Sequence, residues 1–192
     1  MMPTSARTLP VAVRTRGAAA DRGALRVLLR CCLDSGHTVP GTGLGLVLAG
    51  DRLVRRLNRE WRGKDRPTDV LSFPAGDPPP LPPGAEESSG PYLGEIVISV
   101  PRCREQAAMQ GVDPGVELAR LVIHGVLHLL GYDHGDVMER VRMQARERKL
   151  RAWAAGSGIG PGMLRMPGPV AAGATSRSLL PGTPARRSGS AE

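Results

Sequence analysis

Three of the four histidines in this chain, His124, His128 and His134, lie within eleven residues. The first two are at positions i and i+4 of a predicted helix, so their side chains share one face about 5–6 Å apart and can bind one metal ion. Gly131 ends that helix, because glycine adopts the left-handed conformation at low cost, and the chain can turn back with His134. Three imidazoles leave the fourth position of a tetrahedral zinc ion open to water, which is typical of a catalytic site. The spacing therefore predicts one metal ion per chain, on a helix and the turn after it. Zinc is the expected ion, although three imidazoles also accept Ni²⁺, Cu²⁺ or Co²⁺.

The spacing of these histidines equals that of the metzincin protease signature, His-Glu-x-x-His-x-x-Gly-x-x-His. In such proteases the glutamate activates the zinc-bound water and carries its proton to the leaving amine. Gly125 stands at that position here and can do neither. A metalloprotease-like hydrolase that uses the same three histidines is kept as one alternative.

A basic strip runs from residue 52 to residue 66, where seven cations stand against two acids. Such a strip favours contact with phosphate groups. Arg59, Lys64 and Arg66 of this strip are the expected substrate contacts. Arg62 lies at the end of a short helix that the sequence predicts over residues 51–61. A guanidinium at this position can hold a phosphate through two hydrogen bonds.

Apolar periodicity, turn residues and caps predict interleaved strands and helices. The expected strands are residues 11–15, 44–49, 70–73 and 93–100, and the expected helices are residues 21–33, 51–61, 102–110, 114–130 and 136–153. We expect Asp51 to cap the second helix, with Trp61 on its inner face, and Val137, Val141 and Leu150 to be buried in the last helix. The predicted fold is a single α+β domain with a small mixed sheet of about four strands packed with helices.

The folded domain is expected to span residues 11–156, with a proline-rich surface loop at 77–91. Residues 1–10 are predicted to be a flexible N-terminus, and residues 157–192 a disordered, basic tail rich in glycine and proline. No stretch approaches the roughly 20 apolar residues that a membrane span needs. The three cysteines form no CxxC motif and no disulfide framework, which favours a reducing cytoplasm.

Three blocks of the sequence resemble the YbeY family of bacterial ribosomal-RNA maturation factors and endoribonucleases. The blocks are residues 57–74, 93–99 and 124–134, and the similarity runs from about residue 44 to residue 153. The resemblance implies that His124, His128 and His134 are the zinc ligands, and that Arg62 is the functionally important arginine. We therefore expect His124 and Arg62 to act in catalysis.

The resemblance also implies a zinc-dependent, single-strand-specific endoribonuclease. Its expected role is to process the 3′ end of 16S ribosomal RNA and to take part in ribosome quality control, with the small ribosomal subunit and its assembly factors as partners. Asp69 and Asp133 are expected to orient Arg62 or a ligand imidazole, as carboxylates beside metal sites do. A second alternative is a non-catalytic ribosome assembly factor in which zinc only holds the fold.

Overall fold

The computed structural model describes residues 12–15, 20–76, 91–132, 136–157 and 159. The predicted flexible N-terminus and nearly all of the predicted proline-rich loop and C-terminal tail lie outside these residues. The same holds for two candidate site residues, Asp133 and His134. The described residues form the α+β domain expected from the sequence.

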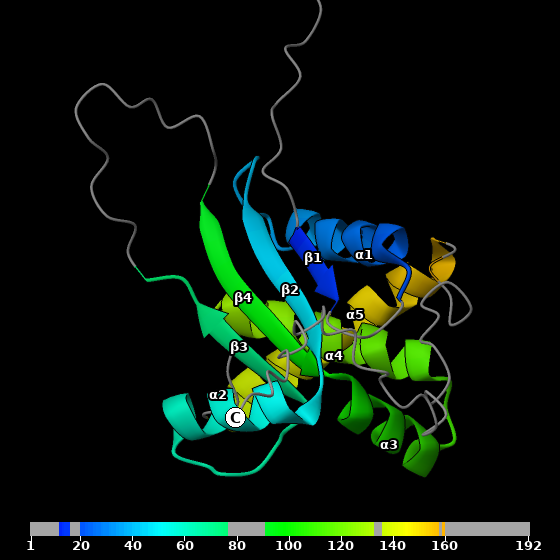
Figure 1. The fold of residues 1–192 in the computed structure, drawn as a ribbon. Helices are drawn as coiled ribbons and strands as arrows, with labels where there is room; N and C mark the ends of the chain where they lie inside the picture. Colours follow the sequence, from blue (N-terminus) through cyan, green and yellow to red (C-terminus); the bar gives the residue numbers. More distant parts are fainter. Residues whose placement is uncertain (1–11, 16–19, 77–90, 133–135, 158, 160–192) are drawn as a thin grey trace, which may run out of the picture.

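Four strands form one sheet in the order β1 (Ala12–Thr15), β2 (Gly43–Ala49), β4 (Tyr92–Ser99) and β3 (Val70–Pro74). The first three are parallel, and β3 pairs antiparallel with β4 at one edge, as Figure 1 shows. All seven residues of β2 are buried, as expected for a strand that is covered on both faces. The prediction of a small mixed sheet is confirmed.

The described residues also form five helices: α1 (Arg22–Ser35), α2 (Asp51–Arg62), α3 (Val100–Gln110), α4 (Pro114–Leu129) and α5 (Val137–Gly156). Helix α2 covers one face of the sheet, whereas α1, α4 and α5 lie on the other side (Figure 1). The larger hydrophobic core lies under α1, α4 and α5, and a smaller one lies under α2. The sheet therefore separates α2 from α4.

Strands β3 and β4 direct alternate side chains toward α2 on one face of the sheet and toward α4 on the other. Leu71 and its cross-strand partner Val97 are buried in the small core under α2. Ser72 pairs with Ile96 across the same strands, and Ile96 is buried in the large core. The register therefore places neighbouring residues of β3 against different helices.

The helix boundaries agree with the sequence signals, with one correction. Asp21 caps α1 and accepts a hydrogen bond from the Ala24 N–H at 3.0 Å. The predicted cap of α2, Asp51, is instead the first residue of the helix, and Gly50 is the cap. The Asp51 carboxylate accepts a hydrogen bond from the Ser99 hydroxyl, so tertiary contact, not capping, is its role.

Helix α5 buries a different face from the one predicted. Val137 and Val141 are 69% and 52% exposed, whereas Leu150 is buried as expected. The buried residues are Met143, Leu150 and Ala154, because only this stripe of the helix reaches the core. The fold also continues past residue 156, since Ile159 is buried in the same core.

No disulfide links the three cysteines, all of which the structure describes. Burial, with the nearby Cys31, raises the pKa of Cys32 to about 12. Burial, with the nearby Glu117, raises the pKa of Cys103 to about 12 as well. Among the described helices, none is both long and apolar enough to cross a membrane.

Candidate functional site

Helix α4 carries the first two histidines of the candidate metal site. It begins at Pro114, where the Asp113 carboxylate accepts a hydrogen bond from the Gly115 N–H at 2.7 Å. Gly125 allows the helix to lie close to the sheet, because a Cβ atom there would lie 2.8 Å from Ile96 Cγ2. Beyond the helix, Gly131 has a φ of +85°, a value that favours glycine and turns the chain as predicted.

His124 and His128 face each other across one turn of α4. Their Nε2 atoms are 3.2 Å apart, and the ring planes cross at 81° with centroids 4.7 Å apart. With zinc–nitrogen bonds of about 2.0–2.1 Å, two nitrogens of a tetrahedral zinc site lie about 3.3 Å apart. The separation of the two Nε2 atoms therefore fits two ligands of one zinc ion with almost no movement.

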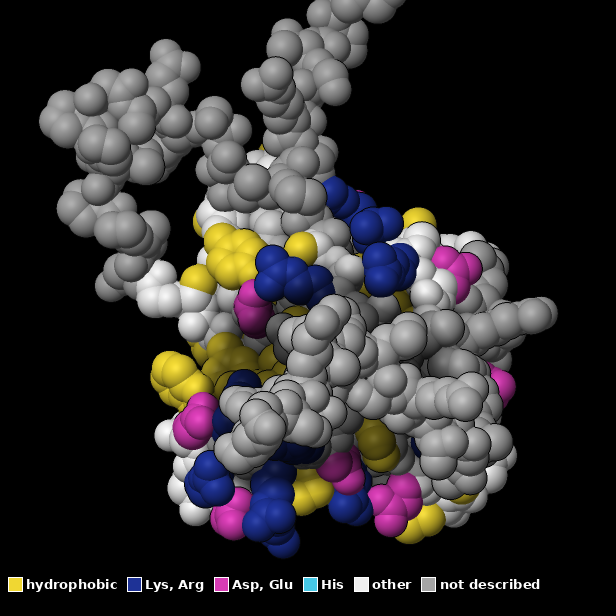
Figure 2. Space-filling model, viewed as in Figure 1, with side chains coloured by type: hydrophobic (Ala, Val, Ile, Leu, Met, Phe, Trp, Pro, Cys, Tyr) yellow, Lys and Arg dark blue, Asp and Glu magenta, His cyan; other side chains and the backbone are white. Residues whose placement is uncertain are grey.

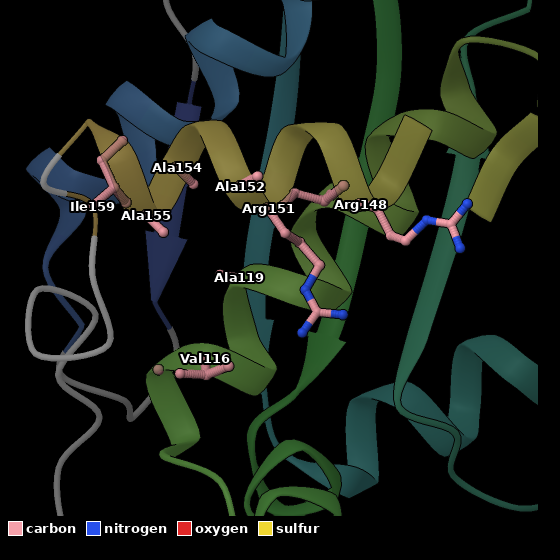
Figure 3. Close-up of a pocket in the computed structure, with 10 residues that line it drawn as sticks. Val116, Ala119, Arg148, Arg151, Ala152, Ala154, Ala155 and Ile159 are labelled. Atoms are coloured by element: carbon pink, nitrogen blue, oxygen red, sulfur yellow. The ribbon is translucent and has the colours of Figure 1, made fainter. Parts of the chain in front are cut away.

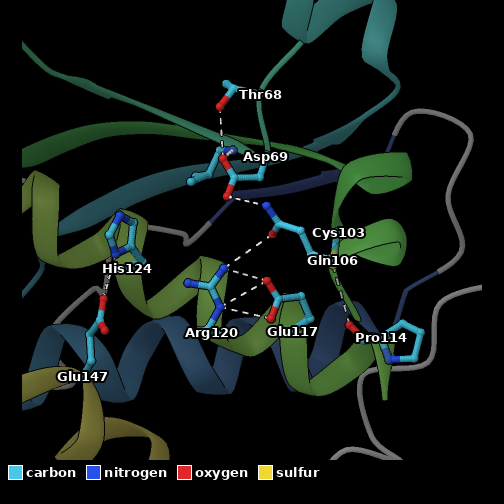
Figure 4. A network of polar contacts seen from close by, with 10 residues as sticks. Thr68, Asp69, Cys103, Gln106, Pro114, Glu117, Arg120, His124 and Glu147 are labelled. Atoms are coloured by element: carbon cyan, nitrogen blue, oxygen red, sulfur yellow. Dashed lines mark hydrogen bonds and ion pairs between the residues drawn. The ribbon is translucent and has the colours of Figure 1, made fainter. Parts of the chain in front are cut away.

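A carboxylate from another helix orients the first histidine. Glu147 of α5 places Oε1 2.7 Å from Nδ1 of His124, and Figure 4 shows these side chains pointing toward each other. Both side chains are mostly buried, at 22% and 19% exposure. A carboxylate beside Nδ1 favours the tautomer with the proton on Nδ1, which leaves the Nε2 lone pair on the side of His128.

Sequence reasoning missed Glu147. It lies 23 residues from His124 and belongs to no recognisable spacing with the histidines. The only signal is its place four residues after Met143, on the stripe of α5 that turns inward. The apolar pattern of α5 predicts a different inner face, and so it does not point to this residue.

The third predicted ligand, His134, and its neighbour Asp133 lie outside the described residues. Within the described part, no group of three His, Cys, Asp or Glu side chains is placed to hold a metal ion. The described pair supplies two imidazoles and an orienting carboxylate. Imidazole ligands with an orienting carboxylate are typical of protein zinc sites, so the described donors fit zinc.

Arg62, the last residue of α2, lines a cavity on the opposite face of the sheet. The cavity has a volume of about 520 Å³. Its lining is Leu57, Trp61, Arg62, Ser72, Phe73, Pro74, Glu95 and Val97. The Arg62 side chain is exposed and forms no hydrogen bond or ion pair with another described residue.

Strand β3 and its neighbour β4 lie between this cavity and the histidine helix. Ser72, one of the lining residues, donates a hydrogen bond from its hydroxyl to the Gly125 carbonyl at 3.3 Å. Gly125 lies between the two histidines in the helical turn. The structure thus brings the Arg62 cavity next to the histidine pair without placing Arg62 in contact with either ring.

The predicted basic strip lies on α2 and the turn after it. Arg59, Lys64 and Arg66 are all exposed. The buried Asn58 side chain donates a hydrogen bond to the Arg66 carbonyl at 2.7 Å, which fixes this turn. Figure 2 shows Lys and Arg side chains at the lower edge of the molecule, near α2, interspersed with Asp and Glu.

An acid within the strip offsets part of its charge. Asp65 accepts two hydrogen bonds from Arg55, at 2.9 and 2.8 Å, and lies 3.7 Å from Arg59 Nη1. The hydrogen bond from Arg55 holds the pKa of the Asp65 carboxyl below its usual range. Arg59 is therefore less available to a phosphate than Lys64 or Arg66.

Asp69 was expected to orient Arg62 or a histidine, and the described contacts do not bring these groups together. Its carboxylate accepts hydrogen bonds from the Val70 N–H at 2.9 Å, the Thr68 hydroxyl at 3.0 Å and the Gln106 amide at 3.1 Å. Burial alone would raise the pKa of Asp69, but these hydrogen bonds outweigh it and lower the pKa. Asp69 fixes the start of β3.

The same network reaches α4 one turn before His124. The side-chain oxygen of Gln106 accepts a hydrogen bond from Arg120 at 3.5 Å. Arg120 also donates to both carboxylate oxygens of Glu117, which is almost fully buried (Figure 4). Buried charges need such partners. The network therefore ties β3, α3 and α4 together around the base of the histidine pair.

A second cavity lies between α4 and α5, with a volume of about 380 Å³. Its polar lining side chains are Arg148 and Arg151, and the rest are glycine or apolar residues. In Figure 3 Arg151 points from α5 toward α4. Among the described residues, no imidazole or carboxylate lines this cavity, so its described lining does not resemble a metal site.

Known proteins share much of this sequence. A family model described as endoribonuclease YbeY matches residues 18–153. A protein named endoribonuclease YbeY from Anaeromyxobacter sp. is 44% identical over 135 residues, which are 70% of this chain and 65% of that protein. One of the same name from Myxococcus xanthus is 48% identical over 110 residues, 57% of this chain and 36% of that protein. The chain thus spans less than two thirds of the length of both relatives.

The fold has a counterpart among solved structures. The solution structure of TM1509 from Thermotoga maritima superposes with a TM-score of 0.53 at 24% identity, and covers 80% of this chain and 95% of that one. This likeness supports the α+β fold. The family model covers most of the described domain, including the basic strip, the edge strand and the histidine helix. On this match the chain belongs to the YbeY endoribonuclease family.

Proposed function

We propose that this protein is a zinc-dependent endoribonuclease that cuts single-stranded RNA during ribosomal-RNA maturation in the cytoplasm. The names of the family model and of its relatives support RNA cleavage. The observation that carries the proposal is the pair of imidazoles with Nε2 atoms 3.2 Å apart, oriented by Glu147. Processing of the 3′ end of 16S ribosomal RNA, ribosome quality control and binding to the small subunit with its assembly factors are part of the proposal.

The three histidines are the proposed protein ligands of the zinc ion. His124 and His128 provide two ligands from α4, and His134 provides the third from the turn after it. Asp133 is proposed to orient His134, as Glu147 orients His124. A bound zinc ion supplies a hydroxide near neutral pH and neutralises charge on a phosphodiester oxygen.

The basic residues act on the RNA backbone. Arg62 acts in catalysis by holding a phosphate of the strand bidentately, which positions the neighbouring bond at the histidine pair across the edge of β3. Lys64 and Arg66, and to a smaller degree Arg59, bind neighbouring phosphates and hold the strand along α2. The cavity beside Arg62 and the histidine pair lie on either side of β3, so one strand of RNA that passes this edge reaches both.

The metalloprotease alternative is disfavoured by the surroundings of Gly125. A side chain at this position would be directed at Ile96 of β4, with its Cβ only 2.8 Å from the isoleucine Cγ2. The position therefore has no room for a glutamate. A peptidase of this type would need a general base from elsewhere in the chain.

The test is cleavage of a single-stranded RNA oligomer by zinc-loaded, full-length protein, beside the same sequence in a duplex. His128→Ala and EDTA should abolish cleavage. Arg62→Ala should lower kcat/KM by roughly 10- to 150-fold, the usual effect of losing a hydrogen bond to a charged group. Arg56→Ala, an exposed arginine of the same helix that pairs with Glu60, is the matched control and should cleave normally.

Two results would decide against the proposal. Cleavage that persists in His128→Ala or in EDTA would show that the activity does not belong to this site. Zinc binding without cleavage, together with normal ribosomal-RNA processing in cells that carry His124→Ala, would favour a non-catalytic assembly factor.

A further inference from the structure

Trp61 is exposed although its helix position predicts an inner-face residue. Its exposed fraction is 70%, and its only described ring contact is edge-to-face with Phe73, with centroids 5.7 Å apart and ring planes at 68°. Both rings line the cavity at the end of α2, together with Leu57 and Val97. Packing in the hydrophobic core does not explain why the large Trp61 ring is exposed beside an apolar cavity.

The size and chemistry of this cavity suit one nucleobase. Its volume of about 520 Å³ accommodates a purine or a pyrimidine with part of its sugar. The aromatic and aliphatic side chains offer flat apolar surface, and Arg62 provides positive charge at the end of α2. Figure 2 shows hydrophobic side chains gathered at the α2 and β3 side of the molecule, next to Lys and Arg.

The charges also set the direction in which a nucleotide lies. Glu95 lines the cavity and is 44% exposed, with Arg14 at 3.9 Å as a distant partner. Its carboxylate repels a phosphate, whereas Arg62, which has no ion pair among the described residues, attracts one. These charges favour a phosphate at the Arg62 end of the cavity, with the base directed toward its apolar lining.

We propose that a single unpaired base of the RNA substrate stacks on Trp61 in this cavity, while Arg62 holds the phosphate beside it. The inference rests on the proposed function, because it names how that site holds its substrate. Stacking on aromatic rings is tolerant of sequence, since every base has a flat face. A base in a duplex is already stacked and paired, so it cannot enter, and the cavity thereby selects single strands.

The position of the cavity supports this role. Ser72 lines it and is hydrogen bonded to the Gly125 carbonyl, within the helical turn that carries the histidine pair. A base anchored on Trp61 therefore keeps the adjoining backbone close to the candidate metal centre. Trp61 would act as a positioning residue that binds substrate and takes no part in the bond-breaking step.

The experiment uses the fact that the chain has only two tryptophans, Trp61 and Trp153. Trp153→Phe in the full-length protein leaves Trp61 as the single tryptophan reporter. A single-stranded 2′-O-methyl oligoadenylate, which lacks the free 2′-hydroxyl, serves as the binding probe for the zinc-loaded protein. We expect it to quench Trp61 fluorescence, and the matching duplex to leave it unchanged.

The affinity change gives the quantitative test. Trp61→Ala should weaken binding of this probe by roughly 5- to 150-fold, the range found when one base-stacking ring is removed. Trp61→Phe keeps an aromatic face and should retain most of the affinity, which controls for misfolding. In cleavage assays Trp61→Ala should raise KM for single-stranded RNA far more than it lowers kcat.

The outcomes separate this inference from the proposed function. Unchanged affinity and KM in Trp61→Ala, or a loss of affinity on Trp153→Ala instead, would overturn the stacking site even if RNA is cleaved. Quenching and weakened binding in a protein that does not cleave RNA would sustain the stacking site and refute the proposed function. No binding of single-stranded RNA by the wild type would refute the inference and leave the cavity to a protein partner.

Discussion

Removal of the Glu147 carboxylate should weaken zinc binding without unfolding the protein. Glu147 contacts Nδ1 of His124 at 2.7 Å, and both side chains are about four-fifths buried. Without this acceptor, the hydrogen bond that holds the tautomer of His124 and the direction of its Nε2 atom is lost. Carboxylates in this position typically contribute 10- to 100-fold to metal affinity.

The size of the effect can be ranked by two variants. Glu147→Ala removes the acceptor and should lower zinc affinity by about 10- to 100-fold, or roughly 1.4–2.8 kcal/mol. Glu147→Gln keeps a neutral Oε1 acceptor for the Nδ1 proton, so its loss should be smaller. Competition titration against a fluorescent zinc chelator measures both affinities directly.

Glu139→Ala is the matched control, because this exposed acid lies on the same helix. It should bind zinc as the wild type does. If Glu147→Ala binds zinc with unchanged affinity, or if Glu139→Ala loses as much, the orienting role of Glu147 is wrong. Circular dichroism of each variant shows whether the helices are retained.

Three further outcomes are expected from the described contacts. Gly125→Ala should destabilise the fold by about 1–2 kcal/mol in urea unfolding because its Cβ would crowd Ile96; a gain of about 1 kcal/mol, as helix propensity alone would give, would contradict the close packing. Because the pKa of Asp69 is lower in the folded protein, the unfolded chain binds more protons than the folded one as the pH falls below about 4. The stabilisation from Asp69 is therefore present above that pH and is lost as acid protonates the folded carboxyl. Asp69→Asn should flatten this loss below about pH 4, and an unchanged acid profile would count against it. A thiol reagent followed by mass spectrometry should modify Cys31 first in the native protein, because the other two cysteines are buried with pKa values raised to about 12; equal labelling of all three would contradict that burial.

Much of the fold was accessible from local sequence signals. Pro114 and Gly131 bracket the histidine helix, and each acts through a backbone property that needs no tertiary context. The inner face of α5 was not accessible in this way. Val137 and Val141 are as apolar as the buried Leu150, but the first turns of α5 extend beyond the core and stay exposed. Only the packing of α5 against α4 selects the buried stripe.

The residues of the candidate site also differ in how far the sequence alone predicts their contacts. The histidine pair depends on a spacing within one helix, so sequence alone predicted it. Glu147 joins the site across two helices, and Asp69 binds Gln106 of α3 instead of a site residue. Both depend on which helix faces lie together, and a single sequence does not reveal this. The partition of Arg62 and the histidines onto opposite faces of the sheet was hidden for the same reason.

Zinc content of the purified full-length protein tests the central claim most directly. Elemental analysis by mass spectrometry should find one zinc ion per chain in the wild type, and a large loss in His124→Ala and in His128→Ala. His37→Ala is the matched control, since this fourth histidine is exposed and lies near the end of α1. Equal zinc in the two α4 variants and the wild type, or an equal loss in His37→Ala, would contradict a metal centre built on the histidine pair.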